Sequence, residues 1–66
     1  MRITVNEEAR EFADGMTIEA LLAVLGFSGR RLAVEVNEDV VPRSRHAQHV
    51  LKDGDHVEIV HAIGGG

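Results

Sequence analysis

The sequence ends in three consecutive glycines, Gly64, Gly65 and Gly66, and these residues carry its clearest chemical signal. Glycine loses more backbone freedom on ordering than any other residue, so a compact fold gains no stability by holding such a segment. We therefore expect residues 64–66 to form a flexible tail. An extended segment from Ala62 to Gly66 would reach about 16 Å beyond the last strand, far enough to enter the active site of another protein.

The reactive group of this tail would be the α-carboxylate of Gly66. A carboxylate is a poor acyl donor, but adenylation by ATP turns it into a mixed anhydride that a sulfur or nitrogen nucleophile can attack. Because Gly64 and Gly65 have no side chains, they can pass through a narrow channel, and their backbone groups can pair with an extended strand of the partner. The chain has no cysteine, so sulfur could be carried only on the terminal acyl carbon, as a thiocarboxylate.

Two further positions are candidates for contact with a partner protein. Val60 falls out of step with Val57 and Ile59, so in a strand it would lie on the opposite face, in an exposed apolar patch that meets the activating enzyme. The alternative is that Val60 packs against a neighbouring loop. Arg43 is a candidate docking residue for an acidic partner surface, together with Arg45; the alternative is that both are simply solvated charges.

The histidines are the remaining residues of chemical interest. His46 and His49 could bring two imidazoles together if their segment were helical, as in some metal sites. No cysteine and no third converging ligand is evident, so we predict no metal site. We interpret all four histidines as exposed polar residues on turns and strand edges: His46, His49, His56 and His61.

Length and composition exclude several classes of protein. With 66 residues the chain forms one domain, whose thin core leaves no room for a deep catalytic cavity, and this argues against a self-contained enzyme. The net charge of -4, the scattered basic residues and the presence of only two aromatic residues disfavour a nucleic-acid partner. The longest uncharged stretch, from Ala20 to Gly29, is too short to span a membrane, and the N-terminus lacks the form of a signal peptide. We expect a cytoplasmic protein that binds no cofactor and no membrane.

The first half of the chain predicts a hairpin followed by one helix. Alternating side chains predict a strand over Arg2–Asn6, and a second strand over Arg10–Ala13 would place Phe12 in the core. Thr17 is a good N-cap, and Gly26 a plausible left-handed C-cap. Between them an apolar stripe at spacings of three and four residues predicts an amphipathic helix, comprising Ile18, Leu21, Leu22 and Leu25.

The second half predicts three more strands. Leu32–Asn37 alternates most regularly and is the best candidate for a central strand, and Val40–Val41 is a short strand that Pro42 ends or confines to an edge. The segment from Arg43 to His49 is too polar for the core. Val50 and Leu51 are apolar anchors, Lys52–Asp55 is a tight turn, and His56–Ala62 is the last strand. The order is β-β-α-β-β-β, an α+β fold with a small mixed sheet over residues 1–63 and the tail over 64–66.

A resemblance to a known family covers nearly the whole chain. It rests on Ile3-Thr4-Val5-Asn6, on Gly15-Met16-Thr17-Ile18 with Leu21-Leu22, on Val34 to Asn37 with Val41-Pro42-Arg43, and on Leu51 to Val60 leading to Gly65-Gly66. In this combination and at this length, the sequence resembles the ThiS family of sulfur carriers in thiamine biosynthesis, which have the ubiquitin-like β-grasp fold. One departure is Gly64 before the final diglycine, which makes the tail looser and should cost little function.

The resemblance implies that the chain meets several partner enzymes in succession. A ubiquitin-activating-type adenylyltransferase would use ATP to adenylate Gly66, and a cysteine desulfurase or rhodanese-type donor would supply the sulfur of the thiocarboxylate. The carrier would then deliver that sulfur to thiazole synthase. In this scheme the chain is a co-substrate of other enzymes and is not itself an enzyme.

Three alternatives stay open. The small subunit of molybdopterin synthase uses a similar terminal thiocarboxylate, although such chains are generally longer. A ubiquitin-like modifier would use the same adenylated tail with a lysine as acceptor. A ligand-binding or regulatory β-grasp domain would have an inert tail, so truncation of Gly65 and Gly66 would not change its activity.

Overall fold

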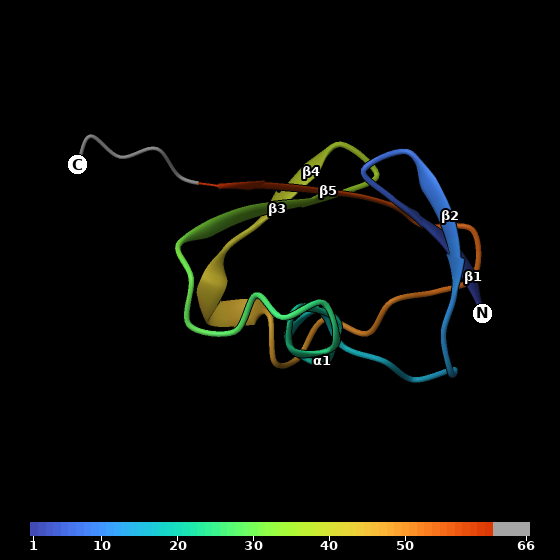
Figure 1. Cartoon of the computed structure of the whole chain (residues 1–66), viewed down its shortest axis with the longest axis horizontal. Helices are drawn as coiled ribbons and strands as arrows, with labels where there is room; N and C mark the ends of the chain where they lie inside the picture. The colour runs from blue at the N-terminus through green and yellow to red at the C-terminus, as the bar shows by residue number, and fades with distance from the viewer. Residues whose placement is uncertain (62–66) are drawn as a thin grey trace.

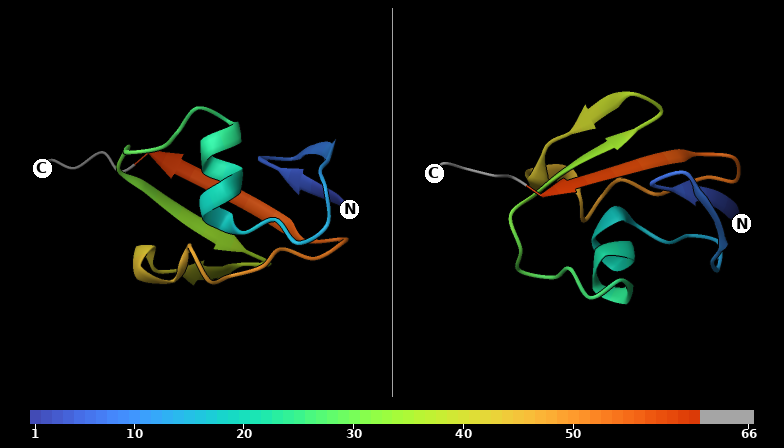
Figure 2. Two further views of the ribbon diagram at one scale, coloured as in Figure 1. Left: turned by 90° about the horizontal axis from the view of Figure 1, so that it is seen from below. Right: turned by 45° about the horizontal axis from the view of Figure 1, so that its top comes forward.

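The computed structural model describes residues 1–61, which form a five-stranded mixed sheet with one α-helix across one face (Figures 1 and 2). The strand order is β2-β1-β5-β3-β4; β1 and β5 are parallel, and the other neighbours are antiparallel. The elements are β1 (Arg2–Val5), β2 (Glu8–Glu11), α1 (Ile18–Val24), β3 (Leu32–Val36), β4 (Asp39–Val41), the 3-10 helix η1 (Arg43–Arg45) and β5 (His56–His61). The predicted α+β class is confirmed.

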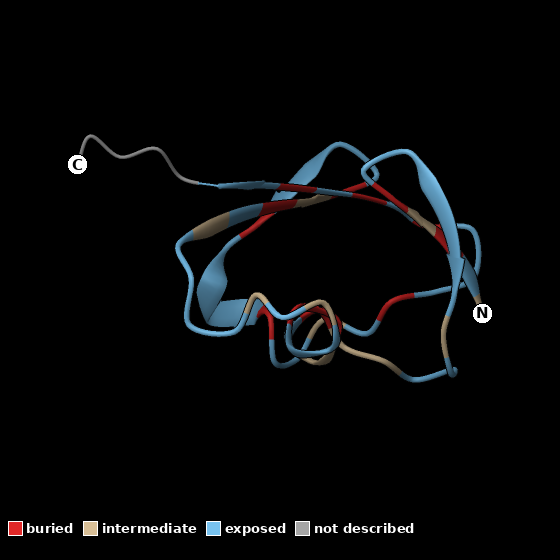
Figure 3. Cartoon of the chain, viewed as in Figure 1, coloured by how far each residue is buried: buried red, intermediate tan, exposed pale blue. Residues whose placement is uncertain are grey.

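The hydrophobic core lies between α1 and the inner face of the sheet (Figure 3). Alternate residues of β1, β3 and β5 point inward because successive side chains of a strand lie on opposite faces. The helix contributes the stripe predicted from its spacing. The buried apolar residues are Ile3, Val5, Ile18, Leu21, Leu22, Val34, Val36, Val41, Leu51, Val57 and Ile59.

Both predicted caps of α1 are present. The Thr17 hydroxyl accepts a hydrogen bond from the Ala20 backbone N–H at 3.1 Å, satisfying one of the free donors of the first turn. At the other end Gly26 has φ 81°. Its N–H donates to Ala23 O at 3.1 Å and the Phe27 N–H donates to Leu22 O at 2.7 Å, which is the Schellman arrangement.

The two hairpins turn at equivalent residues. Asn6 and Glu7 have φ values of 49° and 72°, and Asn37 and Glu38 have 53° and 74°. Positive φ at both central residues is the mark of a type I′ turn, whose twist matches that of the flanking strands. Because the first turn takes only two residues, β2 begins at Glu8, two residues earlier than predicted.

Three expectations about the sheet and loops need correction. Phe12 lies beyond the end of β2 and is only partly buried against the core. The central strand is β5 rather than β3, because β1 pairs in parallel with β5 and thereby places it in the middle. Val50 is no core anchor: it is exposed and bridges to Thr17, whereas Leu51 is buried.

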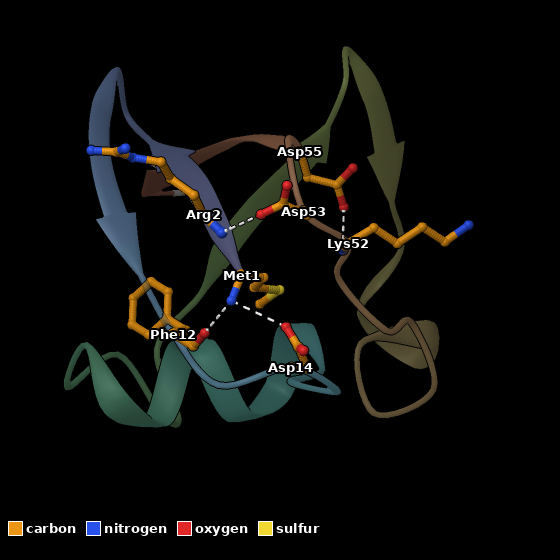
Figure 4. A network of polar contacts seen from close by, with 7 residues as sticks. All are labelled: Met1, Arg2, Phe12, Asp14, Lys52, Asp53 and Asp55. Carbon is orange, nitrogen blue, oxygen red and sulfur yellow. Dashed lines mark hydrogen bonds and ion pairs between the residues drawn. The ribbon is translucent and has the colours of Figure 1, made fainter.

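Polar contacts join the start of β1 to two loops (Figure 4). The Met1 ammonium donates to Phe12 O at 2.6 Å and lies 3.1 Å from an Asp14 carboxylate oxygen. The Arg2 backbone N–H donates to Asp53 Oδ1 at 2.6 Å. These contacts lie at the end of the molecule opposite to the end of β5 (Figure 1), so they stabilise the body away from the predicted tail.

Candidate functional site

The predicted tail residues Gly64, Gly65 and Gly66 lie outside the described residues. The part of the site that the structure describes is therefore the end of β5, which leads to them in the sequence. His61 is its last residue, paired in register with Leu32 of β3. The ring of Phe27 contacts the His61 ring edge-on with centroids 5.6 Å apart, and the Arg30 guanidinium lies 5.9 Å from the Phe27 centroid. This places an aromatic contact and a cation beside the end of β5.

Val60 lies on the outer face of the sheet, away from the helix. Its side chain is 54% exposed, while Val57 and Ile59 are buried. Its partner across β3 is Ala33, which is also exposed, and Val40 of β4 is 66% exposed on the same face. These three residues, here called the apolar strip, leave apolar surface in water: Val60 and Ala33 near the end of β5, and Val40 opposite Glu35. A role of Val60 in binding a partner stays a prediction.

Acidic residues border the apolar strip. Glu35 and Glu58 are directly opposite each other on β3 and β5, an arrangement in which like charges repel. A hollow of about 550 Å³ lies at these acidic residues and is lined by Thr4, Glu7, Glu35, Glu38, His56 and Glu58. The outer face therefore combines apolar and negative surface, which fits a partner with apolar and basic side chains.

Arg43 is exposed at the start of η1 on the helix side of the sheet. It lines a hollow of about 310 Å³ together with Phe27, Arg30 and Leu32. The structure thus brings Arg43 to the same end of the molecule as the end of β5, but not onto the face that carries Val60. A partner contacting both residues would have to reach around this end.

Of the four histidines predicted to be exposed, His49 is only partly exposed, and the prediction is wrong for His46. Only 6% of this residue is exposed, and its Nε2 donates to Val41 O at 3.0 Å. The segment after β4 was expected to stay outside the core because of its polarity, but the imidazole satisfies a backbone carbonyl and so can be buried. His56 lies on the surface, with Nδ1 2.8 Å from Thr4 Oγ1.

Sequence reasoning missed the roles of the two turn asparagines. Asn6 holds β5 through both side-chain polar atoms at Ile59, whereas Asn37 accepts from the His56 N–H and donates to the Asp55 carboxylate just before β5. A usable signal was present, since both turns read Asn-Glu and asparagine is favoured where φ is positive. What the sequence lacked was the identity of the strand that each side chain reaches.

Metal and membrane sites find no support in the described structure. Within residues 1–61 no three His, Asp or Glu side chains come together in a way that could hold a metal ion. The single α-helix of this part of the chain, Ile18–Val24, is too short to cross a membrane.

Comparison with known proteins gives one consistent family. The model of the ThiS family matches residues 3–66. The sulfur carrier protein ThiS of Escherichia coli is 36% identical over 66 residues, and the match covers the whole of both chains. A thiazole synthase of Paramagnetospirillum magneticum is 50% identical over 66 residues. These are all the residues of this chain but only 20% of the length of the synthase.

The fold agrees with this assignment. The crystal structure of the thiamine biosynthesis protein ThiS from Geobacter metallireducens matches with a TM-score of 0.87 and 32% identity, over the whole of both chains. The predicted β-grasp fold is therefore confirmed. Matched along nearly its full length by family model, sequence and structure, the chain belongs to the ThiS family.

Proposed function

We propose that this protein is a sulfur carrier of thiamine biosynthesis, which delivers sulfur for the thiazole ring as a thiocarboxylate on Gly66. The observation that carries the proposal is the full-length similarity to the Escherichia coli sulfur carrier protein ThiS. The absence of cysteine from the sequence supports it, because the terminal acyl carbon is then the only place where sulfur can be attached.

The proposed chemistry takes place in the active sites of partner enzymes. A carboxylate oxygen of Gly66 attacks the α-phosphorus of ATP, and pyrophosphate leaves. The terminal sulfur of a persulfide on a cysteine desulfurase or rhodanese-type donor then attacks the acyl carbon and AMP leaves, which forms an acyl disulfide. A thiol attacks the donor's sulfur in that disulfide, so the thiocarboxylate is released on Gly66 and a disulfide remains on the donor. The ATP belongs to a ubiquitin-activating-type adenylyltransferase, and the chain is its co-substrate. We place these steps in the cytoplasm, where ATP is available.

The two parts of the chain have separate tasks in this proposal. Residues 1–63 form the body that docks on the partner, and residues 64–66 form the tail that enters its active site. The exposed Val60 and the borders of the apolar strip contact the partner on the outer face. Arg43 makes a contact with acidic side chains at the same end of the body.

Thiazole synthase is the proposed acceptor of the sulfur. Support comes from the thiazole synthase of Paramagnetospirillum magneticum, in which a segment of similar sequence makes up 20% of the chain. A synthase that carries its own carrier-like segment indicates that the two functions work together.

Rescue of mutant strains tests the pathway. The gene should restore growth without thiazole to a strain lacking its own carrier, and the variant lacking Gly65 and Gly66 should not. A strain deficient in molybdenum cofactor should not be rescued. Rescue of the second strain alone would contradict the proposal and favour the molybdopterin synthase alternative. Rescue of the first strain by the variant lacking Gly65 and Gly66 would favour an inert tail.

A further inference from the structure

The end of β5 is held on its β1 side by a side chain where a strand would otherwise lie. β1 pairs with β5 only at Thr4 with His56 and Val5 with Val57. At the next residue, Asn6, the chain turns away into β2. The Asn6 backbone N–H still donates to Val57 O at 2.9 Å. Its side chain then reaches one step further: Nδ2 donates to Ile59 O at 3.3 Å and Oδ1 accepts from the Ile59 N–H at 2.8 Å.

This contact is the last one on that side of β5 within residues 1–61. Because the backbone groups of Ile59 face β1, those of His61, two residues later, face the same side, where the described structure has no further strand. Beyond Ile59 the strand is held by β3 and by the ring of Phe27. Asn6 therefore fixes the final point at which β5 is held from both sides before the chain continues to Gly66.

Asn37 makes an equivalent contact at the other end of β5. It is the first residue of the second type I′ turn, with φ 53° against 49° for Asn6. Its Oδ1 accepts from the His56 N–H at 2.9 Å, and its Nδ2 donates to Asp55 Oδ1 at 3.0 Å. The two asparagines thus share turn position, backbone conformation and the use of both side-chain atoms. They differ in which end of β5 they hold.

We propose that Asn6 is a positioning residue for adenylation of Gly66: by clamping Ile59 it sets where the tail starts relative to the docked body. This inference rests on the proposed function. Adenylation requires the Gly66 carboxylate to lie within reacting distance of the ATP α-phosphorus, and a displacement of about 1 Å can lower a rate about 100-fold. If the body docks normally but the end of β5 is shifted, few of the complexes that form are productive.

Substitution of both asparagines by glycine provides a matched comparison. Glycine accepts the positive φ of each turn without strain, so Asn6→Gly and Asn37→Gly remove the side-chain hydrogen bonds and share the same added freedom of the unfolded chain. The measurement is adenylation of the full chain by its activating enzyme at saturating ATP, with carrier concentration varied. We expect Asn6→Gly to lower kcat at least about tenfold with KM changed less than about twofold, and Asn37→Gly to leave both within about twofold.

A structural readout accompanies the kinetics. Amide hydrogen exchange at Ile59 should become faster in Asn6→Gly and stay unchanged in Asn37→Gly, because only the first variant loses the acceptor of that N–H. Asn6→Asp retains an oxygen that can accept from the Ile59 N–H but cannot donate to Ile59 O. Its kcat should lie between those of the wild type and Asn6→Gly. If Asn6→Gly does not fold, this variant carries the comparison.

Several outcomes would overturn the inference. Equal losses of kcat in the two glycine variants would reduce Asn6 to a purely structural role, as would an Asn6→Gly effect confined to KM. An Asn6→Gly or Asn6→Asp carrier with wild-type kcat would also refute it. A wild-type chain that is not adenylated at all would instead refute the proposed function, so the two failures are distinguishable.

Discussion

A single buried histidine links the loop after β4 to both layers of the fold. His46 Nε2 donates to Val41 O, and His46 O accepts the Glu19 N–H of α1 at 3.1 Å. His46→Ala removes the first of these bonds together with the packing of a residue that is only 6% exposed. We expect the free energy of unfolding to fall by about 1–3 kcal/mol, measured by urea denaturation. Gln48→Ala, at an exposed position of the same loop, should change it by less than about 0.5 kcal/mol. Equal effects of the two substitutions would show that the His46 bond contributes nothing.

At the residue scale, local roles could be predicted from the sequence and tertiary ones could not. Thr17 and Gly26 were identifiable because a helix cap acts on backbone groups only a few residues away. His46 was missed although its acceptor lies only five residues earlier, because no sequence pattern indicates the loop conformation that turns the imidazole back toward β4. Asn6 was missed because its side chain bonds to a residue 53 positions later.

At the element scale, α1 depends on its N-cap and on packing. A helix of seven residues is too short to be stable alone. Thr17→Ala should lower the free energy of unfolding by about 1 kcal/mol, because an N–H of the first turn loses its acceptor. The measurement is thermal or urea unfolding of the whole domain. Thr17→Ser keeps the hydroxyl and should lose clearly less; a Thr17→Ser variant as unstable as Thr17→Ala would assign the effect to the methyl group instead.

The elements themselves were largely predictable, and their neighbours in the sheet were not. Alternation located β1, β3 and β5, and the stripe located α1, because these patterns follow from geometry within each element. The start of β2 depended on a two-residue turn in which Glu7 has positive φ, an uncommon conformation for that residue. The central place of β5 arises from its parallel pairing with β1, across 52 residues of sequence, which no local pattern encodes.

At the scale of the whole molecule, the outer face should determine docking without affecting stability. Val60→Asp adds a charge to the apolar strip, so we expect weaker binding to the activating enzyme in a titration. Since Val60 is already solvent-exposed, the substitution should change the free energy of unfolding of the domain by less than about 0.5 kcal/mol. Val24→Asp alters a similarly exposed valine on α1 and should bind as the wild type does. Equal weakening by both substitutions would contradict docking through the outer face.

The acidic border of that face predicts a salt dependence. Because Glu35, Glu38 and Glu58 lie near the apolar strip, a basic partner surface would be attracted over a distance of about 10 Å in 0.1 M salt. Binding should therefore weaken as salt rises from about 50 to about 500 mM, because salt screens the attraction between the charges. Stopped-flow fluorescence should show that the loss comes mainly from slower association. Binding that strengthens with salt would indicate a purely apolar contact.

The central claim is that Gly66 carries sulfur, and the mass of the intact chain tests it most directly. The chain is co-expressed with its activating enzyme and sulfur donor, purified and measured by mass spectrometry. We expect a species heavier by the difference between a sulfur and an oxygen atom, absent from the variant lacking Gly65 and Gly66. A chain of unchanged mass, or one found only in conjugates with lysines of other proteins, would contradict it.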